Sequence, residues 1–386
     1  MRRTDGTARR WAVVAAVVAV LVSIPLVSSV WPAADQPDRS AAQLRDAALA
    51  SADLPFSGTA QSVGTLALPA ADELDAASAQ ADSATVADLL SSRTTMRVWW
   101  RAADAHRVDV VTTTGETDTY TDAGGQWVWE YEDNRATRTD TPSGDAGLAL
   151  PGATDLLPAT LGRRLLSEAE PAELSRIGAD RIAGRTALGV RVTPGGAAGD
   201  VSSVDRVDVW VDAETGLPLA VQVVGRDTEL PAIDTRLLSV DLAAPAADVT
   251  TFTAPTNART RTGGVSEVLA EAARRLPLRD LPDTLAGLPR RDDAGAPDTV
   301  ALYGRGVTVL AVIPLPGGLA RDLSRAADLD PTTIRDDLGI RLASGPLGFL
   351  LTSASGGGGS YLLTGTVTLD GLAAAAGELP GLRGAA

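Results

Sequence analysis

The chain has 386 residues, of which 45% are hydrophobic and 22% are charged, and its formal net charge is −15. This composition is typical of a globular protein long enough for two domains, and the negative charge argues against a nucleic-acid partner. The chain has no cysteine and a single histidine, which excludes disulfides and acylation at cysteine and argues against a histidine-based metal site. We therefore predict neither a metal nor a cofactor.

The first element in the chain is an uncharged apolar run from Trp11 to Trp31. As a helix its 21 residues would span about 31 Å, close to the thickness of a bilayer core. Four arginines precede the run and a tryptophan stands at each end, which favours an N-terminus inside the cytoplasm. Residues 1–34 thus predict a single-pass anchor in the cytoplasmic membrane, with the bulk of the chain extracytoplasmic. A cleaved signal peptide is the alternative, although such peptides have shorter apolar regions.

A helix and a meander of strands follow. The composition of Ser40–Ala52 is helical, and from Phe56 the apolar period changes to two. Between Thr94 and Thr139, short alternating runs are separated by two to four turn residues. Such runs predict antiparallel neighbours in one sheet.

Alternation within the meander assigns aromatic side chains to strand faces. Met96, Val98 and Trp100 share a face of one strand, and a second strand carries a similar set, Trp127, Trp129 and Tyr131. We predict that one side of the sheet is rich in aromatic surface. The opposite, solvated side is predicted to carry Arg97, Arg101, Glu130 and Glu132, with Trp99 as an exception.

The next segments alternate between helical and strand patterns. Thr154–Ile177 supplies apolar positions for helices that pack on the sheet, and "GADRIAGRTALGVRVTP" predicts a strand pair. In "VDVWVDAETGLPLAVQV" the valines at 207, 209 and 211 share a face, and Leu219 and Val221 continue it on the return strand. Gly216 closes that hairpin in a left-handed conformation. We count nine or ten strands in one antiparallel sheet with segregated helices, an α+β fold or half-barrel.

The order of "FSGTAQ", "HRVDVV", "YTDAGGQWVWEYEDNRATR", "RIAGR" and "VWVDAETGLPL" resembles the LolA/RseB superfamily, nearest to its sigma-E regulatory RseB/MucB branch. The resemblance covers residues 45–255. It implies an open β half-barrel around helices, with an apolar concave surface that accepts acyl chains. For RseB-type members it also implies a periplasmic anti-sigma-factor partner, control of that factor's proteolysis, and a smaller C-terminal domain.

The rest of the chain fits a two-domain organisation. After the anchor we expect a LolA/RseB-like domain at 40–255, a linker with a helix at 256–297, and a small α+β domain at 298–386. The last domain is predicted to hold two hairpins, a helix over "GLARDLSRAADL", a further strand, and a terminal helix with Thr368 as its N-cap.

Residues with catalytic potential are few. His106 opens a strand beside Arg107 and is expected at the surface, and the glycines of "YGRG" and "GGGGS" lack the following helix that a phosphate loop needs. Glu130 and Glu132 would lie about 7 Å apart on an exposed strand. We therefore predict that the chain is not an enzyme.

The predicted binding surface is the apolar face of the sheet, although the same side chains could equally be core beneath the helices. The leading hypothesis is an anchored regulator that binds an anti-sigma factor or another envelope protein and senses a lipid-like ligand. The alternatives are a LolA-like lipid or lipoprotein carrier and a structural cell-envelope module. The residues assigned to the surface are Met96, Val98, Trp100, Trp127, Trp129, Tyr131, Val209, Val211, Leu219 and Val221.

Overall fold

The computed structural model describes residues 39–66, 86–112, 115–140, 152–262, 281–291, 300–315, 317–353 and 360–379. The predicted anchor at Trp11–Trp31 and the helix expected within the linker lie outside these ranges. None of the described helices has the length and apolarity needed to cross a bilayer.

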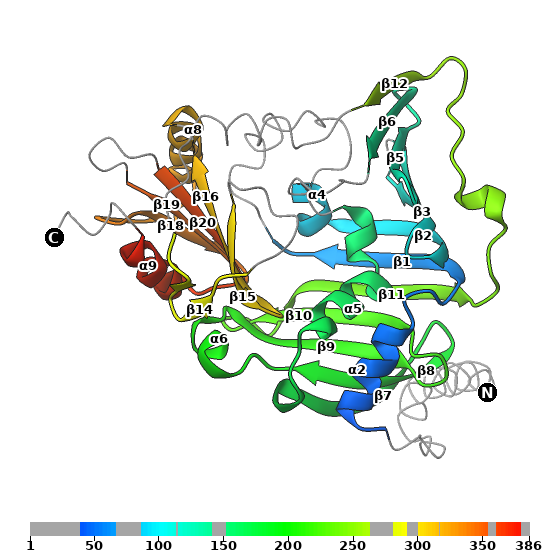
Figure 1. Ribbon diagram of the computed structural model, residues 1–386, viewed down its shortest axis with the longest axis horizontal. Coiled ribbons are helices and arrows are strands. Elements are labelled where there is room, and N and C mark those ends of the chain that lie inside the picture. Colours follow the sequence, from blue (N-terminus) through cyan, green and yellow to red (C-terminus); the bar gives the residue numbers. More distant parts are fainter. Residues whose placement is uncertain are drawn as a thin grey trace, which may run out of the picture. The chain divides into compact units, whose positions relative to one another are not determined.

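Most of the described strands form one large, open sheet (Figure 1). The order of its strands is β12-β6-β5-β4-β3-β2-β1-β11-β10-β9-β8-β7. All neighbouring strands are antiparallel except β12, which runs parallel to β6. The strands are β1 (Phe56–Gly64), β2 (Arg93–Ala102), β3 (Ala105–Val111), β4 (Glu116–Asp122), β5 (Gly125–Glu130), β6 (Arg135–Asp140), β7 (Leu174–Ile182), β8 (Arg185–Val192), β9 (Val204–Asp212), β10 (Pro218–Gly225), β11 (Pro231–Asp241) and β12 (Arg259–Thr262).

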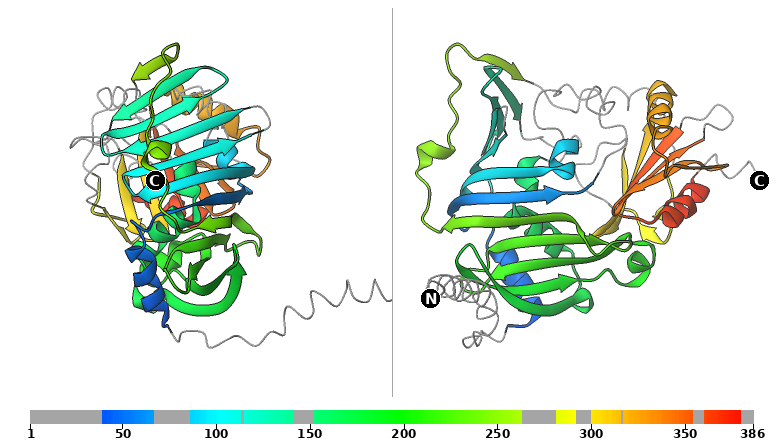
Figure 2. Two further views of the ribbon diagram at one scale, coloured as in Figure 1. Left: turned by 90° about the vertical axis from the view of Figure 1, so that its right-hand side faces the viewer. Right: turned by 180° about the vertical axis from the view of Figure 1, so that it is seen from behind.

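Helices lie on one face of this sheet, which we call the inner face. In Figure 1, α2 (Ala41–Ala50) and α5 (Pro158–Ser167) lie in front of β8–β10, and in the reverse view of Figure 2 the strands lie in front of the helices. The 3-10 helix η1 (Ala153–Leu156) precedes α5, and α4 (Val86–Ser91) packs beside β1. The inner face and these helices together form the apolar core of the large sheet.

The first helix is confirmed where the sequence predicts it. Ser40 caps α2, because its hydroxyl accepts from the Gln43 N–H and the Gln43 side chain accepts from the Ser40 N–H. This capping box satisfies two N–H groups that the helix cannot pair itself. Leu44 and Ala48, one turn apart, are buried against the sheet.

The helical segment predicted for Thr154–Ile177 is shorter than expected. Helix α5 ends at Ser167, and after the 3-10 turn η2 (Pro171–Glu173) the chain enters β7, so Ile177 lies in a strand. The leucines of this segment favour a helix. Ile177 is nevertheless held in β7, where its side chain occupies the space that the missing side chain of Gly189 in β8 leaves free. Pairing with β8 overrides the local helical preference.

The predicted hairpin between β9 and β10 is confirmed. Gly216 has φ +80°, and a Cβ there would lie 2.5 Å from the Ala47 carbonyl oxygen of α2. Oδ1 of Asp212 accepts from the N–H groups of Glu214 and Thr215 and so closes the turn. Glycine is therefore required both for the turn and for the close approach of helix α2.

A second sheet is formed by the C-terminal part of the chain, with order β15-β16-β20-β19-β18-β17. Leu350 and Leu351 are consecutive in β19 but belong to different apolar clusters, one with helix α9 (Leu369–Glu378) and one with α8 (Gly317–Ala327), so the two helices cover opposite faces. Thr368 caps α9 as predicted. The strands are β15 (Ala301–Arg305), β16 (Thr308–Leu315), β17 (Ile334–Asp336), β18 (Gly339–Ser344), β19 (Leu347–Thr352) and β20 (Ser360–Gly365).

Smaller elements adjoin the two sheets. The helix α6 (Gly196–Val201) leads to Ser202, which forms a β-bridge with Val367, and β13 (Thr284–Leu285) pairs with β14 (Leu288–Pro289). The described fold is α+β, rich in strands and built on open sheets. The large sheet exceeds the predicted nine or ten strands, and β12 was not predicted because Arg259–Thr262 has no apolar alternation. The division into domains stays a prediction.

Candidate functional site

Seven of the ten residues predicted to form the binding surface lie on the inner face and are buried. Trp100 stacks on Phe56 with ring centroids 6.1 Å apart, and its indole Nε1 donates to the Ala52 carbonyl oxygen at 3.0 Å. Helices α2 and α5 cover the opposite end of the face, where Gly162 of α5 lies against Pro218 and Val209. The buried set is Met96, Val98, Trp100, Val209, Val211, Leu219 and Val221.

Trp127 and Trp129 lie on the opposite face, which we call the outer face. Along the registers, Val98 lies opposite Val108, Val108 opposite Thr119, and Thr119 opposite Val128. Since side chains alternate along a strand, the neighbours of Val128, Trp127 and Trp129, point away from the face of Val98. The prediction of a single aromatic surface is therefore wrong. Tyr131, just after β5, is 70% exposed.

The outer-face tryptophans are covered by the chain's own connection between β11 and β12. We call residues 242–258 the strap; it contains the 3-10 helix η3 (Ala247–Thr250) and crosses the outer face of the meander (Figure 2, left). Phe252 of the strap lies 5.1 Å from the Tyr120 ring, 5.2 Å from Trp127 and 6.1 Å from Trp129, measured between centroids. Trp127 and Trp129 are thus packed as structural residues.

An ion-pair network occupies the rest of this face. Arg107 donates to Asp109 at 2.6 Å and to Asp118 at 2.8 Å, and Arg97 pairs with Asp109 and Glu116. Burial, reinforced by the charge of Asp109, raises the pKa of Asp118 to about 7. The three carboxylates could together hold a cation, but the two guanidiniums already bind their oxygens and supply that charge.

Glu130 was predicted on the solvated side together with Arg97, and this is wrong. Glu130 is buried on the inner face, where its two oxygens accept from Arg135 at 2.6 and 2.7 Å. Arg97 lies on the outer face, 5.9 Å from the Trp99 ring. The strand register that places Trp127 and Val98 on opposite faces of the sheet also places Glu130 and Arg97 on opposite faces.

His106 was expected at the surface but is only 4% exposed. Its ring stacks on Trp100 with centroids 4.2 Å apart and 15° between planes. Burial lowers the pKa of His106 to about 4, against the opposing hydrogen bonds with the backbone of Ala102 and Ala103, so the imidazole is neutral at pH 7. Its Nδ1 is buried and has no hydrogen-bond partner.

Further unpartnered polar atoms lie on the inner side. In the described ranges nine buried side-chain polar atoms have no hydrogen-bond partner. Five of them belong to residues on the inner face or on the helices that cover it. These are Ser62 Oγ, His106 Nδ1, Thr121 Oγ1, Thr154 Oγ1 and Thr160 Oγ1.

A buried polar atom without a partner costs roughly 1 to 3 kcal/mol, so such atoms often mark a site for water or a ligand. Thr235 shows the ordinary arrangement on the same face, because its hydroxyl donates to the Leu156 carbonyl oxygen at 2.7 Å. Sequence reasoning missed these residues because isolated threonines carry no pattern. The arrangement can hold an apolar molecule that brings hydrogen-bonding groups of its own.

Comparison with known proteins gives matches to solved structures only: no family model and no curated protein matches the chain. The crystal structure of MucB in complex with MucA(peri) is similar at 20% identity and TM-score 0.47, over 87% of this chain and 97% of that one. The Pseudomonas aeruginosa MucA/MucB complex has 20% identity and TM-score 0.46, with coverage of 86% and 96%. A LolA superfamily protein from Nitrosomonas europaea has 10% identity and TM-score 0.25, with coverage of 55% and 98%.

The solved structures that match this chain thus include MucB and a LolA superfamily protein, which are the groups that the sequence resembles.

Proposed function

We propose that this chain is a non-catalytic envelope regulator that binds a lipid-like ligand between the inner face and its helices. The observation that carries the proposal is the set of unpartnered polar atoms at Ser62, His106, Thr121, Thr154 and Thr160. They lie beside an otherwise apolar core. An acyl chain with a polar head would satisfy such atoms while it remains in apolar surroundings.

The helices supply the means of entry. Leu156 and Leu157 of η1 and its end, and Ala159 of α5, pack in the same apolar cluster as the inner face, and non-directional apolar contacts can reform around a ligand. The Thr235 hydroxyl is the polar link between the sheet and η1. Displacement of η1 and α5 would expose Met96, Val98 and Trp100, which are three of the seven inner-face residues predicted from the sequence.

The partner that we propose is the extracytoplasmic part of an anti-sigma factor or a similar envelope protein. A solved structure similar to this chain is MucB in complex with MucA(peri), which suggests a partner of that kind. The predicted anchor at Trp11–Trp31 would hold the chain at the cytoplasmic membrane. This favours a fixed regulator over a LolA-like carrier, which has to diffuse between membranes.

The ligand proposal can be tested on the full chain purified from a bacterial envelope in lipid nanodiscs of known composition. Native mass spectrometry after release should show an acyl lipid retained by the wild type and reduced at least threefold in a Thr121→Val, Thr154→Val double variant. Thr235→Val is the matched control, since its hydroxyl already has a protein partner. Equal retention by all three proteins would show that the inner face is only core.

A further inference from the structure

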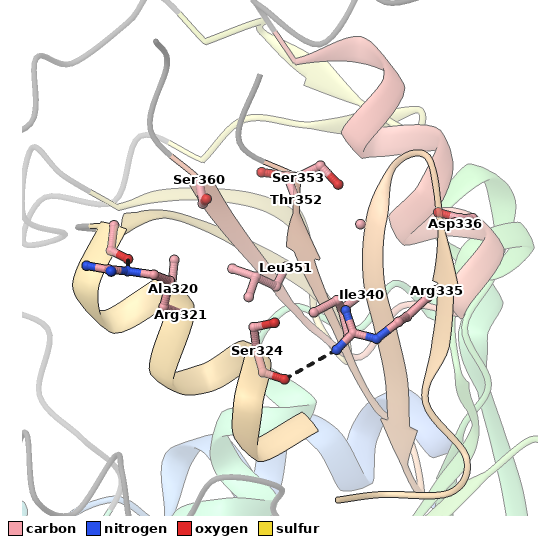
Figure 3. Close-up of a pocket in the computed structure, with 12 residues that line it drawn as sticks. Ala320, Arg321, Ser324, Arg335, Asp336, Ile340, Leu351, Thr352, Ser353 and Ser360 are labelled. Atoms are coloured by element: carbon pink, nitrogen blue, oxygen red, sulfur yellow. Dashed lines mark hydrogen bonds between the residues drawn. The ribbon is translucent and has the colours of Figure 1, made fainter. Parts of the chain in front are cut away.

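The second sheet contains a pocket that the proposed function does not use. It has a volume of about 570 Å³ and lies between α8 and strands β17–β20 (Figure 3), which is within the size range of small-molecule sites. The space exists because α8 presents Gly317, Ala320 and Ser324 toward the strands, and none of these has a long side chain. The pocket belongs to this helix and its sheet, separate from the inner face of the large sheet.

The floor of the pocket is apolar. Ile340 of β18 and Leu351 of β19 point into it (Figure 3) and belong to the same apolar cluster as Ala320. Both are more than nine-tenths buried. An apolar group placed here would remove further hydrocarbon surface from water.

The walls carry a net positive charge in a chain whose formal net charge is −15. Arg321 and Arg335 line the pocket together with a single carboxylate, Asp336. That carboxylate is neutralised, because it pairs with Arg341 and also accepts from the Leu338 N–H at 3.0 Å. The pocket is therefore lined by two arginines, and none of its described lining residues is an unpaired acid.

The two arginines differ in what they already bind. Arg335 extends toward α8, where it lies 3.5 Å from the Ser324 carbonyl oxygen (Figure 3). It also pairs with Asp328. Arg321 donates through Nε to the Gly317 carbonyl oxygen at 3.0 Å. Among the described residues Arg321 has no carboxylate partner. Its charge is thus available to an anion.

Hydroxyl groups complete the polar rim. The Thr352 hydroxyl accepts from the Tyr361 N–H at 2.8 Å, which leaves its own O–H able to donate. Ser353 and Ser360 line the same end of the pocket (Figure 3). Guanidinium and hydroxyl donors are both groups that bind carboxylates and phosphates.

We propose that this pocket binds a small amphipathic anion, a single carboxylate or phosphate carried on a short apolar group. The anionic end pairs with Arg321 and the hydroxyls, and the apolar part lies over Ile340 and Leu351. Both parts contribute, so neither a bare anion nor a neutral alcohol of the same length should bind as tightly.

The test uses isothermal titration of the full chain in nanodiscs with hexyl phosphate and hexanoate, subtracting empty nanodiscs. Inorganic phosphate and 1-hexanol are the comparison compounds. Arg321→Gln should weaken binding about tenfold, as expected for loss of a charged hydrogen bond. Arg325→Gln is the matched control, because Arg325 lies one turn further on α8 and, among the described residues, pairs with Asp322 alone. It should bind like the wild type.

Hydrogen–deuterium exchange locates the site. Hexyl phosphate should protect residues 317–327 and 347–353, and Ser324→Leu, which fills the pocket, should abolish that protection. The Thr121→Val, Thr154→Val variant should bind unchanged, so failure here and failure of the inner-face proposal are distinguishable. If hexyl phosphate bound more tightly than hexanoate, the natural ligand would be a phosphate. If hexanoate bound more tightly, the natural ligand would be a carboxylate.

Three results would overturn the proposal. They are absence of binding to the wild type, equal effects of Arg321→Gln and Arg325→Gln, and inorganic phosphate or 1-hexanol binding as tightly as hexyl phosphate.

Discussion

At the scale of single residues, His106 combines burial with a titratable ring. Its pKa in the folded chain is about 4, below the ordinary value of 6.5, because burial disfavours the imidazolium. Arg163 opposes the charge as well, and Asp104 favours it. When the pH falls from 6.5 toward 4, the unfolded chain binds this proton before the folded chain does, so stability is lost in that window.

The substitution His106→Leu should remove the contribution of His106 to the loss of folding stability at acid pH. Between pH 7.5 and 5 the free energy of unfolding of the wild type should fall by about 2 kcal/mol more than that of the variant. Urea titrations at both pH values measure the difference. Asp118, with a pKa of about 7 in the folded chain, loses stability as the pH rises instead, but it is present in both proteins and cancels. Identical pH dependence of the two proteins would contradict the assignment.

The threonines of the inner face permit a second comparison. In lipid-free protein, Thr121→Val removes a buried hydroxyl that has no partner, so the free energy of unfolding should rise by about 1 kcal/mol. Thr235→Val leaves the Leu156 carbonyl oxygen unpaired and should lower it by about 1 to 2 kcal/mol. We expect urea titrations to show changes in the free energy of unfolding of opposite sign for the two variants. Destabilisation by both variants would mean that the Thr121 hydroxyl is satisfied.

At the scale of elements, one aromatic side chain of the strap packs on the meander. Phe252 contacts the rings of Tyr120, Trp127 and Trp129, and no other aromatic residue occurs in residues 242–258. The strap therefore converts an exposed sheet face into a second packed layer. The strap also explains why Trp127 and Trp129 are packed as structural residues, although their alternation along β5 resembles that of a binding surface.

Phe252→Ala should lower the free energy of unfolding by about 2 kcal/mol, less than for a fully buried phenylalanine because Phe252 is only half-buried. Hydrogen exchange of residues 242–258 should also become faster. Tyr131→Ala is the control, since that side chain is 70% exposed and the substitution should change stability by less than about 0.5 kcal/mol. If the two variants behaved alike, Phe252 would not be the anchor of the strap.

At the scale of the whole described chain, ion pairs join the two sheets. Glu173 accepts from Arg305 at 2.9 Å through both oxygens, and Glu168 binds Arg291 and the Gly306 N–H. The hydrogen bond from Arg291 lowers the pKa of Glu168; at Glu173 burial acts to raise the pKa, but the bonds from Arg305 and backbone N–H groups outweigh it. This connection is present above pH 4.5 and is lost as the pH falls below that value.

Replacing Glu168 and Glu173 with glutamine should uncouple the two sheets. All five tryptophans of the described residues lie in strands β2, β5 and β9 of the large sheet, so the change in their fluorescence on unfolding reports that sheet, whereas far-ultraviolet circular dichroism reports both sheets. The wild type should show coincident urea transitions, and in the double variant the dichroism should change at lower urea. Glu214→Gln, at a side chain that is 82% exposed, should leave them coincident. Coincident transitions in the double variant would show that the ion pairs do not couple the sheets.

Local patterns in the sequence determined which segments are strands, turns and capped helices. The roles of Gly216 and Thr368 are predicted correctly because left-handed turns and capping depend on a few neighbouring residues. Alternation likewise grouped Val209 with Val211 on one face. The resemblance to the LolA/RseB superfamily depends on the same short motifs.

Only the tertiary structure decided which face of the sheet each strand turns toward the helices. Alternation relates residues within one strand, but the register between strands depends on every turn, and a shift of one residue exchanges the two faces. That is why Trp127 and Trp129 lie on the outer face, Glu130 lies on the inner one, and His106 is buried against Trp100. The unpartnered threonines of the inner face have the same cause, because their surroundings come from segments distant in sequence.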